Sequence, residues 1–400
     1  MTSPARWPLH PPPSAGEALS SWLTRIAAAH RLRLDELLAD NLGTYTFDVF
    51  DRTTGGLDIT PPRELLVALE QRTGRDRHEL WGMSIAGNVP WLLDDLEPSD
   101  DEEAFHTYVR QHHVLLTARE RPARLASPWR AWLPREPLRR ACPTCIAGPE
   151  RVPGLTLVSQ LPLTLSCPRH GCYLESAYGS LDTNIIWVDG HAEPRPAPPA
   201  VRAMDQRSAD ALRVGIVRLP RRDVHAGIWF RMLRTIIDEL STSATHARTH
   251  AHTLREVWAS IEQPIRGGLS VWRSFELLDW SIQQRLLEAA AAAIAMIEDG
   301  TIRAPGTDGA LFLPAPHRPA DDGRTPRPIA DSTRTQAEPI DYWKAVVDSF
   351  NEVVSLALAD PAQAELLYRF VSSGPGGPNN ARRILADIGI TEYASSQNIP

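Results

Sequence analysis

Four residues able to bind a soft metal ion occur as two short pairs near the middle of this 400-residue chain. Cys142-Pro-Thr-Cys145 and Cys167-Pro-Arg-His170 each contain two intervening residues, and 21 residues separate the two pairs. One C-x-x-C turn supplies two thiolates, and a second turn of this kind completes the tetrahedral set of donors that Zn²⁺ prefers. The spacing therefore predicts a structural zinc site, and the chain must fold so that the two turns meet.

Two alternatives concern the ligands and the use of this site. Cys172, two residues after His170, is an alternative fourth ligand, although the matched spacing favours His170. A thioredoxin-like redox motif would follow a buried strand and begin a helix. The flanking sequence PREPLRRA has the pattern of neither a buried strand nor a helix, which argues against a redox motif. A catalytic zinc needs an open coordination position, which a filled set of three cysteines and one histidine does not leave. We predict structural Zn²⁺ bound by Cys142, Cys145, Cys167 and His170.

The N-terminal segment has the pattern of a small helical domain. Apolar residues recur at helical spacing from Leu19 to Ala27, and Ser14 with Glu17 predicts a capping box ahead of them. A short helix follows over Asp35–Leu42. Further on, a helix starting at Pro62 and a short one over Asp76–Met83 flank Gly74. This outline indicates a helix-turn-helix, which either recognises DNA or a partner or simply packs.

The rest of the chain is predicted to be a short ribbon followed by helices. Leucines at odd positions from Leu155 to Leu165 have a period of two, which predicts two short strands or an edge strand, with another strand over Ile185–Val188. The prolines of 191–200 indicate a stiff linker. Residues 303–338 have the composition of a disordered segment. The predicted helices are 229–240, 254–261, 274–297, 341–358, 362–370 and 381–388.

These patterns predict a mainly α protein with an N-terminal helix-turn-helix domain, a small central zinc ribbon or knuckle domain, and a helical C-terminal domain. The expected segments are a helical N-terminal domain over 1–118, the zinc domain over 119–190, a helical domain over 201–302, a disordered linker over 303–338, and C-terminal helices over 339–400.

The charge pattern bears on nucleic-acid binding. A net charge of −7 argues against a coat protein for nucleic acid, so any DNA contact needs local clusters of cations. Two clusters exist: nine arginines against three glutamates over 110–151, and eight arginines against three aspartates over 202–234. The alternative for each is a solvated face. The candidate DNA contacts are Arg135, Arg139, Arg140, Arg221 and Arg222.

Motifs for catalysis or membrane insertion are absent from the sequence. It has no G-x-x-x-x-G-K-[ST] loop, G-x-S-x-G elbow or H-E-x-x-H helix, so we predict that the protein is not an enzyme. The histidines of THARTHAHT (His246, His250 and His252) are expected at a solvated helix end, with a metal site as the alternative. No run of about 18 apolar residues and no secretory signal is present, which predicts a cytoplasmic protein without membrane contact.

Two blocks of this sequence resemble the TniQ family. The N-terminal PPPSAGEALSSWLTRIA is similar to that family's proline-rich lead and "E-S-L-x-S-W-L-x-R" helix, with matching residues at Glu17, Leu19, Ser21, Trp22, Leu23 and Arg25. The second block, RRACPTCI followed by SCPRHGCYL, resembles its zinc-knuckle region and includes Gly171 and Leu174. The chain departs from many relatives in having no further cysteine pair after the second knuckle.

The resemblance implies an adaptor in DNA transposition that does not itself cut or join DNA. Such proteins connect target DNA, or a complex that recognises the target, to the transposon's AAA+ ATPase. Some family members are dimers and some work with a CRISPR effector complex. The alternatives from the residues themselves are a stand-alone zinc-containing helix-turn-helix DNA-binding regulator, and a zinc enzyme such as a nuclease or hydrolase.

Overall fold

The structure is a computed structural model. It describes residues 6–42, 56–89, 91–134, 138–148, 154–178, 186–188, 193–265 and 272–314, and, near the C-terminus, 354, 357–358, 360–372, 381–382, 385–386 and 390. The chain divides into two compact units, Met1–His317 and Arg318–Pro400. Helices predominate in the described residues, so the predicted mainly α class is confirmed.

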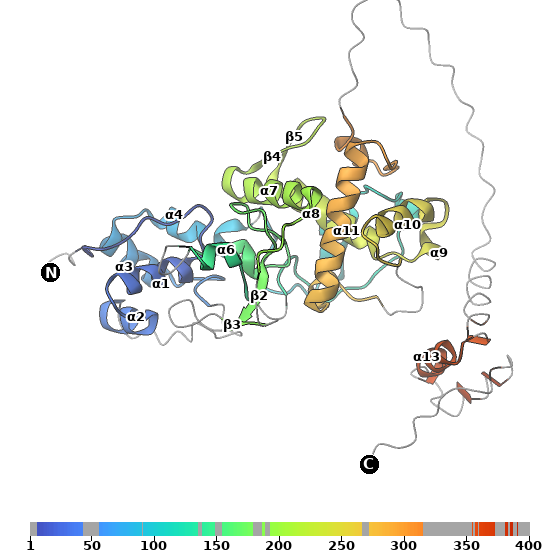
Figure 1. The fold of residues 1–400 in the computed structure, drawn as a ribbon, viewed down its shortest axis with the longest axis horizontal. Coiled ribbons are helices and arrows are strands. Elements are labelled where there is room, and N and C mark those ends of the chain that lie inside the picture. The colour runs from blue at the N-terminus through green and yellow to red at the C-terminus, as the bar shows by residue number, and fades with distance from the viewer. Residues whose placement is uncertain are drawn as a thin grey trace, which may run out of the picture. The chain divides into compact units, whose positions relative to one another are not determined.

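The elements of the first unit follow one another as Figure 1 shows. The helices are α1 (Leu19–Ala29), α2 (Leu34–Leu42), α3 (Arg63–Thr73), α4 (Arg77–Gly82), α5 (Glu102–Phe105), α6 (Pro143–Ile146), α7 (Pro199–Val214), α8 (Ala226–Leu240), α9 (Ala244–Ala247), α10 (Ala251–Ser260) and α11 (Trp280–Glu298). The strands are β1 (Arg140–Ala141), β2 (Glu175–Tyr178), β3 (Ile186–Trp187), β4 (Ile216–Arg218) and β5 (Asp223–His225).

Short helical turns complete the first unit. They are η1 (Ala86–Asn88), η2 (His106–Arg110, a π-helix), η3 (Ala118–Glu120), η4 (Leu157–Gln160), η5 (Arg248–His250), η6 (Phe275–Leu277) and η7 (Gly309–Leu311). In the second unit, α13 (Pro361–Ser372) covers the helix predicted over 362–370. Most of the predicted helices 341–358 and 381–388 lies outside the described residues. Among the described residues, no helix is both long and apolar enough to span a membrane.

The N-terminal helices bury one apolar cluster of their own. Trp22 on α1 and Leu69 on α3 are fully buried, together with Leu80 on α4. Gly74 ends α3 in the left-handed conformation that favours glycine, and Asp76 caps α4 by accepting the N–H of His78. Helices α3 and α4 are thus joined by a short turn at Gly74, and their assignment as a helix-turn-helix stays a prediction. Binding of this pair to DNA also stays a prediction.

A larger core surrounds α8. This helix is buried on nearly every face and packs against α7, α11 and η2. Trp132 and Phe230 meet edge to face at its centre. The core runs from Ala18 to Phe312, so it joins residues on both sides of the boundary predicted at 118 and 119. The five predicted segments remain a prediction.

Three local predictions from the sequence are wrong. The helix predicted to be capped by Ser14 begins only at Leu19, with Ala18 as its N-cap. The predicted strand residues 157–160 form the 3-10 turn η4, because Val158 as well as Leu157 is buried. Residues 303–314 of the segment predicted to be disordered are folded, because Phe312 is fully buried and Asp308 accepts the N–H of His113.

Candidate metal centre

Two antiparallel strands bring the predicted ligand pairs together. β1 leads directly into Cys142, and it pairs with β2, which follows the second knuckle. An isolated bridge between Ser166 and Tyr173 closes that second knuckle. A short ribbon of β1 and β2 is therefore present, whereas the leucine-rich segment between the knuckles, which the sequence predicted to form strands, contains the 3-10 turn η4.

The first knuckle is the N-terminus of α6. Cys142 is its N-cap, and its sulfur accepts the backbone N–H of Cys145 at 3.4 Å. Pro143 occupies the first helical position, where a missing N–H costs nothing. The short helical turn therefore holds both thiols on the same side.

The second knuckle turns at Gly171. The N–H of Gly171 donates to the carbonyl of Cys167 at 2.8 Å, and the N–H of Cys167 donates to the carbonyl of Cys172. Gly171 has φ of 63°, and a Cβ there would lie 2.9 Å from Cδ of Arg202. Glycine is therefore favoured by the backbone conformation, and a larger residue would displace the side chain of Arg202.

The four predicted ligand atoms lie within 4.8 Å of one another. His170 Nδ1 is 3.4, 3.2 and 3.7 Å from the sulfurs of Cys142, Cys145 and Cys167. The sulfurs of Cys145 and Cys167 are 3.8 Å apart. A tetrahedron with Zn–S bonds of about 2.3 Å has edges of about 3.5 to 3.8 Å. The geometry fits a zinc site made of three cysteines and one histidine.

Cys172 lies beside this set without belonging to it. Its buried sulfur is 3.4 Å from that of Cys142. The group whose ligand atoms all lie within 4.8 Å of one another contains His170 and leaves Cys172 out. The geometry therefore favours the ligand set that the spacing predicted.

Local hydrogen bonds prepare one thiol for a metal. A hydrogen bond from Cys142, together with the backbone N–H groups of His170 and Arg169, lowers the pKa of the Cys167 thiol, whereas the pKa values of Cys142 and Cys145 are raised. The thiolate is the form of cysteine that binds metals. Three cysteines and one histidine supply four protein donors, which would leave a bound zinc no position for substrate.

Helix α7 supports the second knuckle from outside. The carboxylate of Asp205, which is 2% exposed, accepts the N–H groups of Leu165 and Ser166 and the hydroxyl of Ser166. The residues just before α7 also contact the second knuckle. The N–H of Tyr173 donates to the carbonyl of Arg195, and the N–H of Ala197 donates to the carbonyl of Gly171. The segment that the sequence predicted to be a linker is thus joined to the metal centre.

The comparison with protein families matches this same part of the chain. Residues 8–174 match the family model described as TniQ. This part of the chain is similar to the TniQ family. The match includes all four predicted metal ligands and covers less than half of the 400 residues. No curated protein and no solved structure matches the chain.

The N-terminal TniQ signature connects α1 to the segment that precedes the second knuckle. Ser21 accepts the N–H of Leu155 at 2.8 Å, and Ala18 N–H donates to the carbonyl of Leu155 at 2.9 Å. Glu17 is buried and accepts hydrogen bonds from Ser21 at 3.2 Å and from Arg25 at 2.7 Å. The signature residues therefore join the two blocks of the TniQ region.

A second contact strengthens the same junction. The buried carboxylate of Asp58 accepts the N–H and hydroxyl of Ser20 on α1 and the side-chain amide of Gln160 on η4. Sequence reasoning missed Asp58, because its partners lie 38 and 102 residues away and no local pattern marks them.

The arginines predicted to contact DNA divide into three groups. Arg140 is buried, and its guanidinium donates to the carbonyls of Ser159, Leu161 and Thr164. It also stacks on Trp280, 4.2 Å from the ring centre. The prediction that Arg140 faces DNA is wrong, because its donors are used inside the protein. Arg139, Arg221 and Arg222 are exposed, and Arg135 lies outside the described residues.

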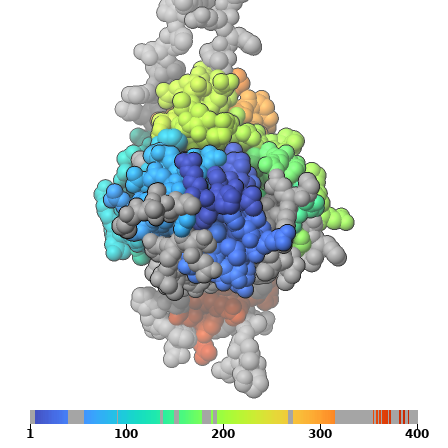
Figure 2. Space-filling model, turned by 90° about the vertical axis from the view of Figure 1, so that its left-hand side faces the viewer, coloured from blue at the N-terminus to red at the C-terminus, as the bar shows by residue number. Residues whose placement is uncertain are grey.

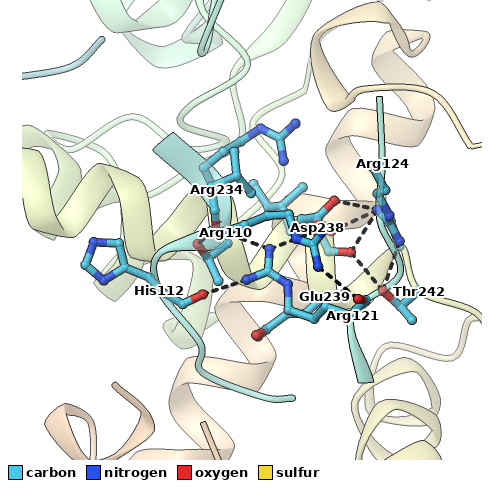
Figure 3. Close-up of polar contacts among 12 residues, drawn as sticks. Arg110, His112, Arg121, Arg124, Arg234, Asp238, Glu239 and Thr242 are labelled. Atoms are coloured by element: carbon cyan, nitrogen blue, oxygen red, sulfur yellow. Dashed lines mark hydrogen bonds and ion pairs between the residues drawn. The ribbon is translucent and has the colours of Figure 1, made fainter. Parts of the chain in front are cut away.

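Other arginines of the basic clusters also point inward (Figure 3). Arg121 and Arg124 converge on Asp238 of α8, at 2.9 and 2.5 Å. Although burial opposes ionisation, the two guanidinium groups hold the pKa of Asp238 below its ordinary value. Arg234 forms a two-pronged ion pair with Glu276. We call these five residues the buried charged cluster.

The histidine-rich stretch forms no second metal site among the described residues. His250 lies 2.6 Å from the carboxylate of Glu120, which also accepts the hydroxyl of Thr249. His246 contacts Ser243, and His252 contacts the carbonyl of Thr249. His250 thus holds η5 against η3, whereas His246 and His252 make local contacts.

Proposed function

We propose that this protein is a non-catalytic adaptor in DNA transposition that connects target DNA, or a target-recognition complex, to the transposon's AAA+ ATPase. The observation that carries the proposal is the match of residues 8–174 to the TniQ family, which includes a cluster of three cysteines and one histidine of suitable geometry. The proposed cofactor is a structural zinc ion held by Cys142, Cys145, Cys167 and His170.

The contacts around the knuckles support such a role physically. An adaptor must hold two binding surfaces in a constant relation, because both partners have to be engaged at once. Asp58 and Ser21 connect the N-terminal helices to the segment between the knuckles, and Asp205 connects the second knuckle to α7. The zinc centre would then be the rigid connection between the N-terminal helices and the α8-centred core.

The donor set supports a structural metal rather than a catalytic one. A zinc enzyme keeps a coordination position for water or substrate. Three thiolates and an imidazole would occupy all four positions. The proposal therefore assigns cutting and joining of DNA to a separate transposase.

The test uses the full chain, immobilised target DNA and the AAA+ ATPase encoded beside it. We expect retention of the ATPase on DNA only when this chain is present, and loss of that retention when His170→Ala removes a metal ligand. Tight binding to one operator sequence without retention of the ATPase would support a stand-alone regulator instead. A second copy of the chain and a CRISPR effector complex are further partners to add to the same assay.

A further inference from the structure

A hairpin outside the TniQ match presents the densest group of exposed arginines on the described surface of the α8-centred core. Strands β4 and β5 pair from Ile216 with His225 to Arg218 with Asp223. Their turn carries Arg221 and Arg222, both exposed, and the side chain of Arg218 is 92% exposed. Residues 218–223 thus hold three arginines and one aspartate.

The hairpin is held firmly at its base. Gly215 ends α7 with φ of 79°, and a Cβ there would lie 2.8 Å from the ring of Trp91. The N–H of Ala226 donates to the carbonyl of Gly215. Val217 and Val224 point inward and are buried. The base therefore has a fixed direction relative to α7 and α8.

The turn is also attached to a third segment. The backbone N–H of Arg221 donates to the carbonyl of Leu311, and its guanidinium donates to the carbonyl of Leu313. This contact fixes one arginine and leaves Arg218 and Arg222 directed outward. In Figure 2 the segment that contains α7 and the hairpin forms the upper end of the face shown, where it protrudes.

We propose that the tip of this hairpin binds the phosphate backbone of duplex DNA, with Arg218 and Arg222 as the contacting side chains. The inference rests on the proposed function, because it names the element that contacts DNA. The exposed guanidinium groups of Arg218 and Arg222 carry the charge that phosphates attract, and binding by a rigid element loses little conformational entropy. The only ion-pair partner of Arg218 in the described residues is Asp223, at a distance of 3.9 Å.

The exposed arginines of the hairpin are less engaged in ion pairs than those of α4 and the turn that precedes it. There Arg75 and Arg77 form ion pairs with Glu79 and Glu70 at 3.2 and 2.8 Å. Those arginines would have to leave a carboxylate before they reached a phosphate. The hairpin therefore offers the better electrostatic match to DNA.

The experiment measures duplex DNA binding by the full chain at several salt concentrations. Each phosphate contact contributes about 0.9 to the slope of log K against log salt concentration. We expect Arg218→Gln with Arg222→Gln to reduce the size of that slope by about 1.8 without changing the melting temperature. The matched control, Arg255→Gln with Arg285→Gln, removes the same charge from exposed positions on α10 and α11 and should leave the slope unchanged.

The possible outcomes distinguish failure of the hairpin inference from failure of the proposed function. If the parent and the hairpin variant bind DNA with the same salt slope, the hairpin inference alone is overturned. The measurement is then repeated with Arg75→Gln and Arg77→Gln to locate the contact. If the hairpin variant keeps the salt slope of the parent but no longer retains the ATPase on DNA, the hairpin is a protein-binding surface. That result also overturns the inference. A parent chain that binds no DNA overturns both the hairpin inference and the DNA-bridging function.

Discussion

Asp205 on α7 accepts both the N–H and the hydroxyl of Ser166, the residue immediately before the metal ligand Cys167. This carboxylate belongs to the region beyond the TniQ match, whereas the ligand belongs to the matched region. The two parts of the first unit therefore meet at the metal centre.

Replacing Asp205 with Ala should destabilise the metal centre without touching a ligand. The change leaves the N–H groups of Leu165 and Ser166 buried without acceptors, which costs about 3 kcal/mol in unfolding free energy. We expect a lower melting temperature and faster loss of zinc to a chelator. Asp210→Ala, on a partly exposed position of the same helix, is the control and should behave like the parent. Equal effects of both changes would show that Asp205 has no special role.

The identity of the fourth ligand is tested by a pair of variants. His170→Ala should lower the zinc content below one ion per chain and lower the melting temperature, because the three remaining cysteines leave the tetrahedron one donor short. Cys172→Ser should retain a full complement of zinc, since Cys172 lies outside the four-atom set. The reverse result, with zinc lost only from the Cys172 variant, would make Cys172 the ligand. Metal content is measured by mass spectrometry of the purified chains.

The buried charged cluster should be sensitive to the loss of one partner. Asp238→Ala leaves Arg121 and Arg124 buried without their carboxylate, and such a change typically costs about 3–5 kcal/mol. Asp94→Ala breaks the more exposed pair with Arg231 and should cost less than about 1 kcal/mol. Chemical denaturation of both variants checks the difference, and similar losses for the two would contradict the structural role of the cluster.

Glu239 should make stability fall as pH rises. Its burial raises the pKa from 4.5 to about 7, so the folded chain binds a proton that the unfolded chain releases. The contribution is therefore complete below about pH 4.5 and is lost as pH rises to about 7. Glu239→Gln cannot titrate, and we expect the difference in unfolding free energy between parent and variant to change across this range. A difference that stays constant would show that Glu239 does not titrate there.

The sequence predicted the metal centre because the spacing within each knuckle is local. A spacing of two residues between ligands is enough to predict each turn. The meeting of the two turns depends on the pairing of β1 with β2, which is not a local feature of the sequence. The exposure of Arg139 and the burial of Arg140 could not be predicted from charge, because both residues carry the same charge and only Arg140 belongs to β1. One is exposed and the other is buried against Trp280.

Helix α7 and Asp205 were missed for a different reason. The prolines before residue 200 indicated a linker, yet Pro198 is the N-cap and Pro199 the first residue of the helix. A usable signal was present, because Asp205 lies among Val201, Met204 and Ser208 on the buried face. A lone carboxylate on an apolar helix face needs a buried partner, and that partner proved to be the second knuckle.

We infer that one zinc ion holds the two knuckles together, and a measurement of zinc stoichiometry and stability in the same preparation tests this. We expect one zinc ion per purified chain, and a strong chelator should remove it and lower the melting temperature, with recovery when zinc is restored. A chain that contains no zinc and melts at the same temperature in chelator would contradict the claim.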